Sequence, residues 1–334
     1  MPFEPTGTMN SDTSSTTAST GYKFAAVVVT FNRKTLLVEC LDALLRQSHP
    51  LDAIFVIDQS SSDGTPELLQ ESGYLQNPVI HYERSKNNTG GAGGFHRGME
   101  RAYQAGYDWI WIMDDDAVAD SEALAQMLPF LSEADTVAIA NVKMSVTGIA
   151  DENHIIRSRS QNSSPLNSTA ITFSSFVGLM VSRRAIKSIG LPKAEFFIYL
   201  DDTEYCMRLQ SAGRILLAEK SIIIHKEIAR SVKSVRHFGM NIPIYSTKDF
   251  IFRDYIGTRN RIWMETRLSN HKVHGFIDIG KDLWFALLRI LFVDRTVLLT
   301  RMHVCLRAVI DGVTGNFDND FAFRMRDKID KSNN

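Results

Sequence analysis

The sequence predicts an α/β fold with a parallel, doubly wound sheet. Three observations lead to this prediction: short apolar runs rich in β-branched residues, helical patterns between these runs, and polar motifs directly after them. Apolar runs of this kind are typical of strands that are buried on both faces. In such sheets ligands bind beyond the carboxyl ends of the strands, so we expect the functional residues at that edge.

Strand and helix alternate along the first third of the chain. The strands are expected at 24–29, 53–57, 79–82 and 109–113. The helical segments are expected at 34–46, after the turn Asp58–Thr65 with Pro66 in the first turn, and from the glycine-rich stretch 88–94 to about 105. This alternation is the pattern of βαβ units, whose strands are parallel.

The pattern is looser in the second half of the chain. Residues 154–170 are polar and predict a long loop. A helix is expected at 203–212, where Glu204 and Arg208 lie one turn apart and can pair on the helix surface.

The apolar run 222–224 predicts one more strand, which ends at His225, and the chain from 248 onward has a mostly helical pattern. Residues 1–21 are rich in Ser and Thr and lack the apolar core of a signal peptide, so they predict a disordered tail. Near the other end, charged residues such as Arg289 interrupt the apolar runs. No uninterrupted apolar span of about 20 residues, the length a transmembrane helix needs, is therefore present.

The composition narrows the function classes. The 334 residues include 44% hydrophobic ones, enough for a sizeable core, and 37 Lys and Arg balance 38 Asp and Glu. A general nucleic-acid binder needs a net basic surface to displace counterions from phosphates, so this class is excluded. The three cysteines lie far apart with no CxxC. A disulfide framework and a thiolate zinc site are therefore not expected, and a reducing cytoplasm fits.

Three consecutive aspartates, Asp114, Asp115 and Asp116, follow the strand expected at 109–113. Like charges at contact distance repel, and a divalent cation removes this cost. Carboxylate oxygens suit Mg²⁺ or Mn²⁺. The alternative is an acidic cluster at a helix N-terminus, but the position at a strand end favours a metal. His225, also at a strand end, is equally consistent with a metal ligand and with a structural histidine.

Asp201 and Asp202 precede the helix expected at 203–212. Carboxylates are favourable at the solvated start of a helix, which is one interpretation. The other is that one of them is a general base that takes the proton of a sugar hydroxyl. The residues alone support both equally.

The glycine-rich stretch Gly90–Gly94 opens a helix but does not match a dinucleotide-binding fingerprint, because His96 occupies the position of the third glycine. A turn that lets the backbone approach a ligand and a site of tight packing are both consistent with it. Five Lys and Arg between 226 and 248 form either a solvated loop or a segment that folds over a pyrophosphate. Arg259 offers a further phosphate donor or belongs to a helix surface.

Taken together, these motifs resemble the family 2 glycosyltransferases, which have the GT-A fold. The resemblance covers about 24–265 and is weaker over the C-terminal helices. The motifs that carry it are Val27–Arg33, Asp58–Thr65, Met113–Asp116, Phe197–Glu204 and His225. The fold so implied is Rossmann-like, with a mostly parallel central sheet flanked by helices. It implies a disordered tail at 1–21, a catalytic GT-A domain at 22–245 and a C-terminal helical region at 246–334.

The resemblance also implies roles for individual residues. The residues expected to bind the nucleotide sugar are Thr30, Asn32, Arg33, Asp58, Asn88, Gly90, Gly91 and Asp115. Those expected to hold a divalent metal, Mn²⁺ or Mg²⁺, on the donor pyrophosphate are Asp114, Asp116 and His225. Asp202, rather than Asp201, matches the general base of the family. The further candidates for acceptor or phosphate contacts are Asp201, Glu204 and Arg259.

The implied reaction is an inverting transfer in which a nucleoside diphosphate leaves and the metal stabilises it. The glycine-rich stretch looks like that of galactofuranosyltransferases, which favours UDP-galactofuranose. The segment Tyr255–Asn260 is shared with rhamnosyltransferases, so dTDP-rhamnose is the alternative donor. A non-catalytic subunit of a polysaccharide assembly complex would lack some of the acidic positions, and here all are present.

Enzymes of this kind build bacterial surface polysaccharides, including lipopolysaccharide O-antigen, on lipid-linked glycan acceptors at the cytoplasmic face of the inner membrane. The resemblance therefore implies a cytoplasmic location. It also allows peripheral contact with the membrane and a homo-oligomer formed through the C-terminal helices. No nucleic-acid partner is expected.

Overall fold

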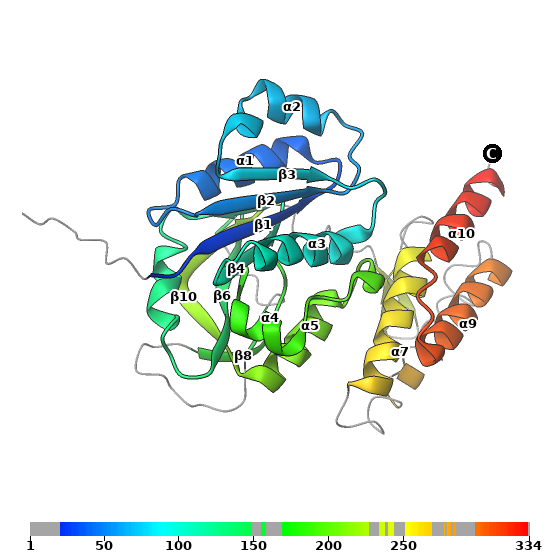
Figure 1. Cartoon of the computed structure of the whole chain (residues 1–334). Coiled ribbons are helices and arrows are strands. Elements are labelled where there is room, and N and C mark those ends of the chain that lie inside the picture. Colours follow the sequence, from blue (N-terminus) through cyan, green and yellow to red (C-terminus); the bar gives the residue numbers. More distant parts are fainter. Residues whose placement is uncertain are drawn as a thin grey trace, which may run out of the picture.

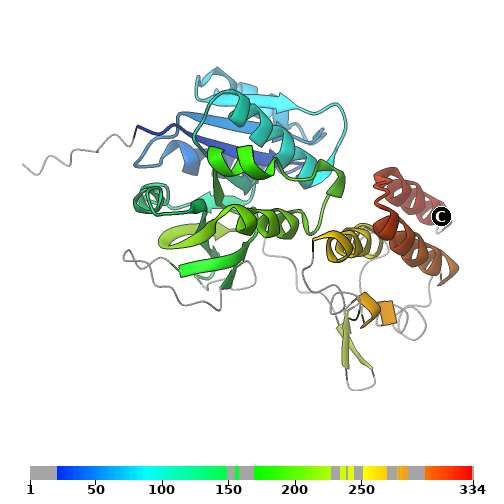
Figure 2. The same ribbon diagram turned by 60° about the horizontal axis from the view of Figure 1, so that its bottom comes forward.

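The computed structural model describes residues 21–148, 155–157, 169–226, 234–237, 240–243, 251–268, 277, 279–281, 283–284 and 298–332. Nearly all of the predicted tail and most of the basic segment 226–248 lie outside these residues. The described chain has a central sheet with helices on both faces, and a group of C-terminal helices lies beside this α/β part (Figures 1 and 2). The predicted fold class is confirmed.

The first half of the sheet is parallel, as the sequence predicts. The strands are β1 (Phe24–Thr30), β2 (Ala53–Asp58), β3 (Ile80–Arg84) and β4 (Trp109–Asp114), in the spatial order β3-β2-β1-β4. The connecting helices are α1 (Lys34–Leu45), α2 (Thr65–Glu71), η1 (Tyr74–Gln76) and α3 (Gly90–Gln104). Each of these strands begins within one or two residues of its predicted position.

Beyond β4 the sheet is mixed. Strand β9 (Leu179–Ser182) runs antiparallel to both of its neighbours, β4 and β6 (Thr136–Ser145). β10 (Arg214–His225) pairs with β6 in parallel. Because β9 reverses the direction twice, β6 and β10 run in the same direction as β1 and β4. The carboxyl ends of these strands therefore lie at one edge of the sheet.

Short strands complete the sheet. They are β5 (Ala117–Ala119), β7 (Ile155–Arg157) and β8 (Thr169–Ser174), while β11 (Ser234–His237) and β12 (Met240–Pro243) form a separate pair. Two parts of this arrangement differ from the sequence prediction. β7 and β8 lie at the ends of the expected loop 154–170, and β10 begins eight residues before the predicted run 222–224.

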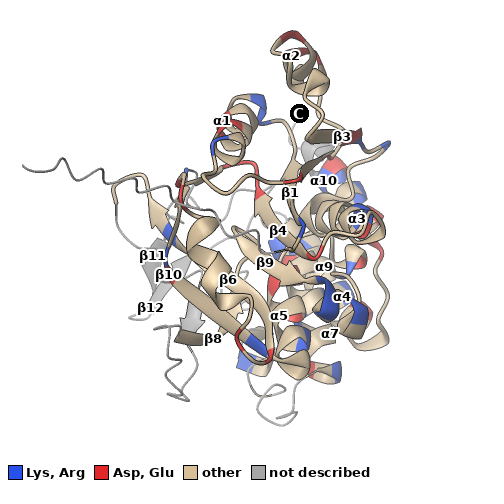
Figure 3. Ribbon diagram, turned by 60° about the vertical axis from the view of Figure 1, so that its left-hand side comes forward, with Lys and Arg blue, Asp and Glu red and all other residues tan. Residues whose placement is uncertain are grey.

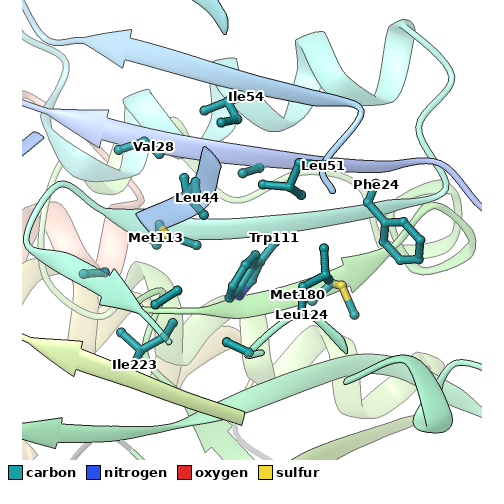
Figure 4. Close-up of a cluster of buried hydrophobic side chains, with 14 of the residues drawn as sticks. Phe24, Val28, Leu44, Leu51, Ile54, Trp111, Met113, Leu124, Met180 and Ile223 are labelled. Carbon is teal, nitrogen blue, oxygen red and sulfur yellow. The ribbon is translucent and has the colours of Figure 1, made fainter. Parts of the chain in front are cut away.

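The core consists of two layers, one on each face of the sheet. Along β1, Phe24 and Val28 pack toward α1, whereas Val27 and Val29 pack toward α3. Figure 4 shows the first of these layers, in which the buried Trp111 ring lies at the centre. Successive side chains of a strand point to opposite faces, so a continuously apolar run fills both layers.

Helices α4 (Arg183–Ile189) and α5 (Asp201–Ala212) cover the α3 face, and η2 (Ala125–Phe130) lies on the other. α5 begins at Asp201, two residues earlier than predicted. Glu204 and Arg208 form the predicted pair, at 2.7 Å, but Glu204 is fully buried, so the pair is not on the surface. Arg208 also donates to the carbonyl oxygens of Ile189 and Leu191.

Arg208 therefore joins α5 to the end of α4, and both carboxylate oxygens of Glu204 accept hydrogen bonds from its guanidinium and hold it in place. The contact of Glu204 with the acceptor or a phosphate stays a prediction; in this structure its buried carboxylate is paired with a guanidinium of the same helix.

The C-terminal part is helical, as expected. It contains the π-helical η5 (Phe252–Gly257), α7 (Thr258–Arg267), α9 (Leu298–Thr314) and α10 (Asn319–Ser332). Residues of η5, α9 and α10 form a buried apolar cluster with Phe197 from the α/β part. No helix among the described residues is both long and apolar enough to cross a membrane.

Arg259 also has a structural position. It is fully buried, and its guanidinium donates to the side chains of Asn260 and Asn319 and, at 3.4 Å, to carbonyl oxygens of η4 (Ala194–Phe196). The contact of Arg259 with a phosphate or the acceptor stays a prediction; in this structure its guanidinium donates to groups inside the protein.

The start of α3 offers a stability test. Gly90 has φ +74°, and a Cβ added there would lie 2.0 Å from the carbonyl oxygen of Phe197, whereas one added at Gly91 would meet nothing within 4 Å. We expect Gly90→Ala to lower the free energy of unfolding by about 2 kcal/mol or more. Gly91→Ala, in the first helical turn, is expected to change it by at most about 1 kcal/mol and to raise it. Urea unfolding of both variants measures this, and equal effects would contradict the packing explanation.

Candidate active site

The predicted site residues lie mainly where β1, β2, β4 and β10 end and where α5 begins. In the sequence these positions are up to about 200 residues apart, and the shared direction of the strands brings them to one edge. Charges of both signs are distributed over the molecule, for instance on α1 and α3 (Figure 3). The near-neutral net charge therefore results from nearly equal numbers of positive and negative side chains.

Two of the three consecutive aspartates are bound to residues of the β1 end. Asp115 accepts a hydrogen bond from Thr30 Oγ1 at 2.7 Å. Arg33 Nη1 lies 3.0 Å from Asp116 Oδ2 and 3.4 Å from Asp115 Oδ1. Both aspartates are almost fully buried, whereas the Arg33 side chain is 42% exposed. Arg33 thus supplies positive charge to the cluster from the solvent side.

The acidic cluster is nevertheless short of positive charge. Burial raises the pKa of Asp115 to about 6, against the hydrogen bond from Thr30 and the charge of Arg33, which lower it. Burial also raises the pKa of Asp114 well above its usual range, and the charges of Asp116, Asp115 and Asp201 raise it further. A cation bound here would reverse these shifts, because it stabilises the ionised carboxylates.

Asp116 and His225 form the part of the cluster that best fits a metal. His225 Nε2 lies 3.3 Å from Asp116 Oδ1, and this oxygen is buried without a hydrogen-bond partner among the described residues. An unsatisfied buried carboxylate oxygen beside an imidazole nitrogen suits a divalent cation such as Mn²⁺ or Mg²⁺.

Asp114, the third predicted ligand, is less well placed. Within the part of the chain that the structure describes, no three His, Cys, Asp or Glu side chains are grouped closely enough to hold a metal ion. The structure therefore brings together two of the three predicted ligands. The donor set fits the predicted metal, while the complete ligand set remains a prediction.

The loops after β1 and β2 are tied to each other. Asn32, at φ +55°, accepts from the backbone N–H of Ser62 at 2.7 Å, and its own N–H donates to Ser61 Oγ at 2.9 Å. Asp58 is buried and accepts from the Ser61 N–H and from the Tyr82 hydroxyl. Burial and the bond to Asp58 raise the pKa of Tyr82. Both oxygens of Asp58 thus have partners in the chain, so its contact with a base remains a prediction.

The predicted donor contacts near α3 have local roles. Asn88 Oδ1 accepts from the Gly90 N–H at 2.7 Å and so satisfies a free donor at the start of the helix. Gly90 packs against the backbone of Phe197, so tight packing explains this glycine. Gly91 has open space around it, and a role for it in ligand binding remains a prediction.

Asp201 and Asp202 occupy the first turn of α5, and both are partly exposed. Burial and the neighbouring charge of Asp202 raise the pKa of Asp201 to about 7. Burial also raises the pKa of Asp202, while hydrogen bonds from Thr203 lower it. Asp201 in turn raises the pKa of Asp114, so the α5 end and the β4 end act on each other electrostatically.

Lys143 is a residue of this region that the sequence analysis missed. It lies near the carboxyl end of β6, is fully buried, and its Nζ donates to Ser174 Oγ. Its charge lowers the pKa of Asp202. The signal was available, because a lysine inside a mainly apolar strand requires a partner.

Comparisons with known proteins indicate the family of the chain. Residues 25–190 match the model of the family described as glycosyl transferase family 2. The chain is 32% identical over 206 residues to galactofuranosyltransferase GlfT1 of Mycolicibacterium smegmatis, covering 56% of this chain and 65% of that protein. It is 23% identical over 310 residues to dTDP-rhamnosyl transferase RfbF of Shigella flexneri, covering 87% of this chain and 95% of that protein. The match to GlfT1 thus spans less than two thirds of that relative.

Solved structures are similar in fold at low sequence identity. S. aureus TarS 1–349 aligns with a TM-score of 0.56 and 16% identity, over 89% of this chain and 82% of that chain. The mannosyltransferase PcManGT from Pyrobaculum calidifontis, in complex with GDP-Man and Mn²⁺, aligns with a TM-score of 0.51 and 12% identity, over 88% of each chain. These identities support the GT-A fold and no finer property.

Proposed function

This chain belongs to glycosyl transferase family 2, and we propose that it transfers a sugar, with inversion, from a nucleotide sugar to a glycan acceptor. The observation that carries this proposal is the group of buried carboxylates at the shared edge of the strands, opposite the two aspartates of α5. The first group can hold the cation that a charged donor needs, and the second can accept a proton. A transfer reaction requires both groups at one site.

The chemistry that we propose for the chain needs one base. Asp202 accepts the proton of an acceptor hydroxyl while the hydroxyl oxygen bonds to the anomeric carbon. The bond from that carbon to the diphosphate breaks, and the nucleoside diphosphate leaves with its electron pair. The raised pKa of Asp202 suits a group that must gain a proton during the reaction.

The acidic cluster has the complementary task at the leaving group. A divalent cation held by Asp116 and His225, together with Asp114, would neutralise the charge that develops on the diphosphate. Arg33 adds a fixed positive charge at the same edge. Thr30 holds the carboxylate of Asp115 in place, and the linked loops at Asn32 and Asp58 form the wall that we assign to the nucleoside.

For the donor we propose UDP-galactofuranose, with dTDP-rhamnose as the alternative. The higher identity to galactofuranosyltransferase GlfT1 supports the first, and the longer match to dTDP-rhamnosyl transferase RfbF supports the second. The acceptor that we propose is a lipid-linked glycan of bacterial surface polysaccharide synthesis, used at the cytoplasmic face of the inner membrane. Contact with that membrane and self-association through the C-terminal helices are parts of the same proposal. A non-catalytic role is disfavoured because Asp116, Asp202 and His225 are all present.

The donor is tested by calorimetric titration with UDP-galactofuranose, dTDP-rhamnose and, as a control, GDP-mannose. In the presence of Mn²⁺ we expect UDP-galactofuranose to bind at least about tenfold tighter than either other sugar nucleotide, which corresponds to about 1.4 kcal/mol. Tighter binding of dTDP-rhamnose would reverse the choice of donor. Binding of none of the three would contradict the proposed function.

A further inference from the structure

The turn that precedes α5 has an unusual backbone. Phe197, Tyr199 and Leu200 have φ values of +63°, +68° and +64°. Residues with a Cβ rarely adopt this left-handed conformation, because the side chain crowds the backbone. Such a conformation persists only when neighbouring groups enforce it, and it occurs most often at functional sites. The 197–200 turn leads without a break into Asp201 and Asp202.

One side chain from the C-terminal helices binds this turn. Asn260, in α7, is fully buried, and its Nδ2 donates to the carbonyl oxygens of Phe196, Ile198 and Tyr199 at 3.0, 3.2 and 2.9 Å. Its Oδ1 accepts from Arg259 at 3.0 and 2.8 Å, which fixes which end of the amide faces the turn. A single amide therefore holds three carbonyl groups of the segment 196–199 from about 60 residues away in the sequence.

Other contacts hold the same turn from the start of α3 and from the C-terminal helices. The carbonyl oxygen of Phe197 accepts from the backbone N–H of Ala92 at 3.1 Å, and Gly90 lies directly against the same carbonyl group. The Phe197 ring packs into the apolar cluster of the C-terminal helices, next to Phe252 and Phe323. The turn thus lies between the start of α3 and the C-terminal helices, and Asn260 and Arg259 are the residues of α7 whose side chains donate to carbonyl groups of Phe196–Tyr199.

We propose that Asn260 is a positioning residue for the base, and that the C-terminal helices serve the reaction by fixing the 197–200 turn. The inference rests on the proposed function, in which Asp202 is the base. α5 begins immediately after Leu200 and has no side-chain cap, so the turn sets where its first residues point. A displacement of about 1 Å in a reacting group can lower a rate about 100-fold, so the position of this turn controls the rate.

Asn260→Asp is the sharpest variant. It keeps the size of the side chain and the oxygen that accepts from Arg259, and it replaces only the nitrogen that donates to the turn. Asn319→Asp is the matched control: Asn319 Oδ1 also accepts from Arg259, but its Nδ2 donates to Glu195 O, outside the turn. Asn260→Ala is a second variant, which removes the donor without adding a charge.

The test compares kcat, the affinity for the nucleotide-sugar donor and hydrogen exchange of the backbone amides between wild type and the variants. Circular dichroism first checks that each variant is folded. For both Asn260 variants we expect kcat to fall at least about tenfold while the dissociation constant of the donor changes less than about threefold. Amide exchange should accelerate at Ala92 and Glu204, whose N–H groups donate to Phe197 and Leu200. Asn319→Asp should leave kcat within about threefold of wild type and the exchange unchanged.

Three results would overturn the inference. One is an unchanged kcat in the Asn260 variants. Another is a dissociation constant of the donor that rises by the same factor as kcat falls. The third is an equal loss in Asn319→Asp, which would point to general loosening of the C-terminal helices. If wild type transfers no sugar at all, the proposed function fails. The exchange at Ala92 and Glu204 then still decides whether Asn260 holds the turn.

Discussion

Asp202→Asn is expected to lower kcat about 1,000-fold while donor binding stays within about threefold of wild type. Removing a general base typically costs 10²- to 10⁴-fold, and Asn cannot accept the proton. Asn has nearly the same size, and its Oδ1 can still accept from the Thr203 N–H, as Asp202 does at 2.6 Å. The turn before α5 should therefore keep its shape. Initial rates with the preferred donor, together with calorimetry for donor affinity, measure the two quantities separately.

Asp201→Asn is the matched control, because it makes the same change one residue earlier in the same helical turn. We expect its kcat at pH 8 to fall less than about tenfold. The pH profile adds a second readout. The two aspartates repel, so neutralising Asp201 should lower the pKa of Asp202 and move the acidic limb of kcat to lower pH. Undiminished transfer by Asp202→Asn would remove Asp202 as the base, and a larger loss in Asp201→Asn would exchange the two roles.

Local sequence patterns predicted the strands of the parallel half of the sheet and the polar residues at their carboxyl ends. The run Phe24–Val29 of β1 is apolar at every position because both faces of the strand are covered, and such a run is recognisable without a structure. The polar residues after β1, β2 and β4 could be assigned to one edge, because parallel strands end on the same side. Asp115 and Thr30 are in contact for this reason, although they are 85 residues apart.

The features that depend on pairing between distant segments were not predictable. β9 is as apolar as a parallel strand would be, so its reversed direction has no signature in its own residues. Glu204 and Arg259 are charged residues of a kind usually found at the surface, so their sequence positions do not indicate burial. They are buried because α5 packs against α4 and α7 packs against η4. The role of Asn260 depends on three carbonyl groups about 60 residues away, and no local pattern indicates such contacts.

Removal of the divalent metal is expected to abolish transfer, with a loss of at least about 100-fold in EDTA and recovery on addition of Mn²⁺ or Mg²⁺. The physical reason is the charge of the site. Asp114, Asp115 and Asp116 are consecutive and largely buried, so their charges act on one another, and Arg33 forms ion pairs with Asp115 and Asp116 from the solvent side. Without a further cation the diphosphate of a donor would meet uncompensated negative charge at the place where it must bind.

Metal binding itself gives a readout that does not depend on transfer. Calorimetric titration with Mn²⁺ should show affinity at least about tenfold weaker in Asp116→Asn and His225→Ala than in wild type. Asp108→Asn is the control, because Asp108 precedes the opposite end of β4 and accepts from the Lys23 N–H at 2.8 Å. Its affinity for Mn²⁺ should equal that of wild type. Protons compete with the metal for carboxylates, and burial raises the pKa of Asp115 to about 6.

Affinity should therefore be lower at pH 5.5 than at pH 7.5, because Asp115, which is mostly ionised at the higher pH, is mostly protonated at the lower one and no longer attracts the cation. Mn²⁺ affinity that is the same in wild type and in both ligand variants would show that the ion binds elsewhere. Full transfer activity in EDTA would instead mean that the chain neutralises the leaving group with its own cations. Arg33 would then be the first residue to substitute, because its guanidinium already lies 3.0 Å from Asp116 at the edge where the diphosphate is expected. The two outcomes separate a metal-assisted departure of the diphosphate from one assisted by a side chain on the same sheet edge.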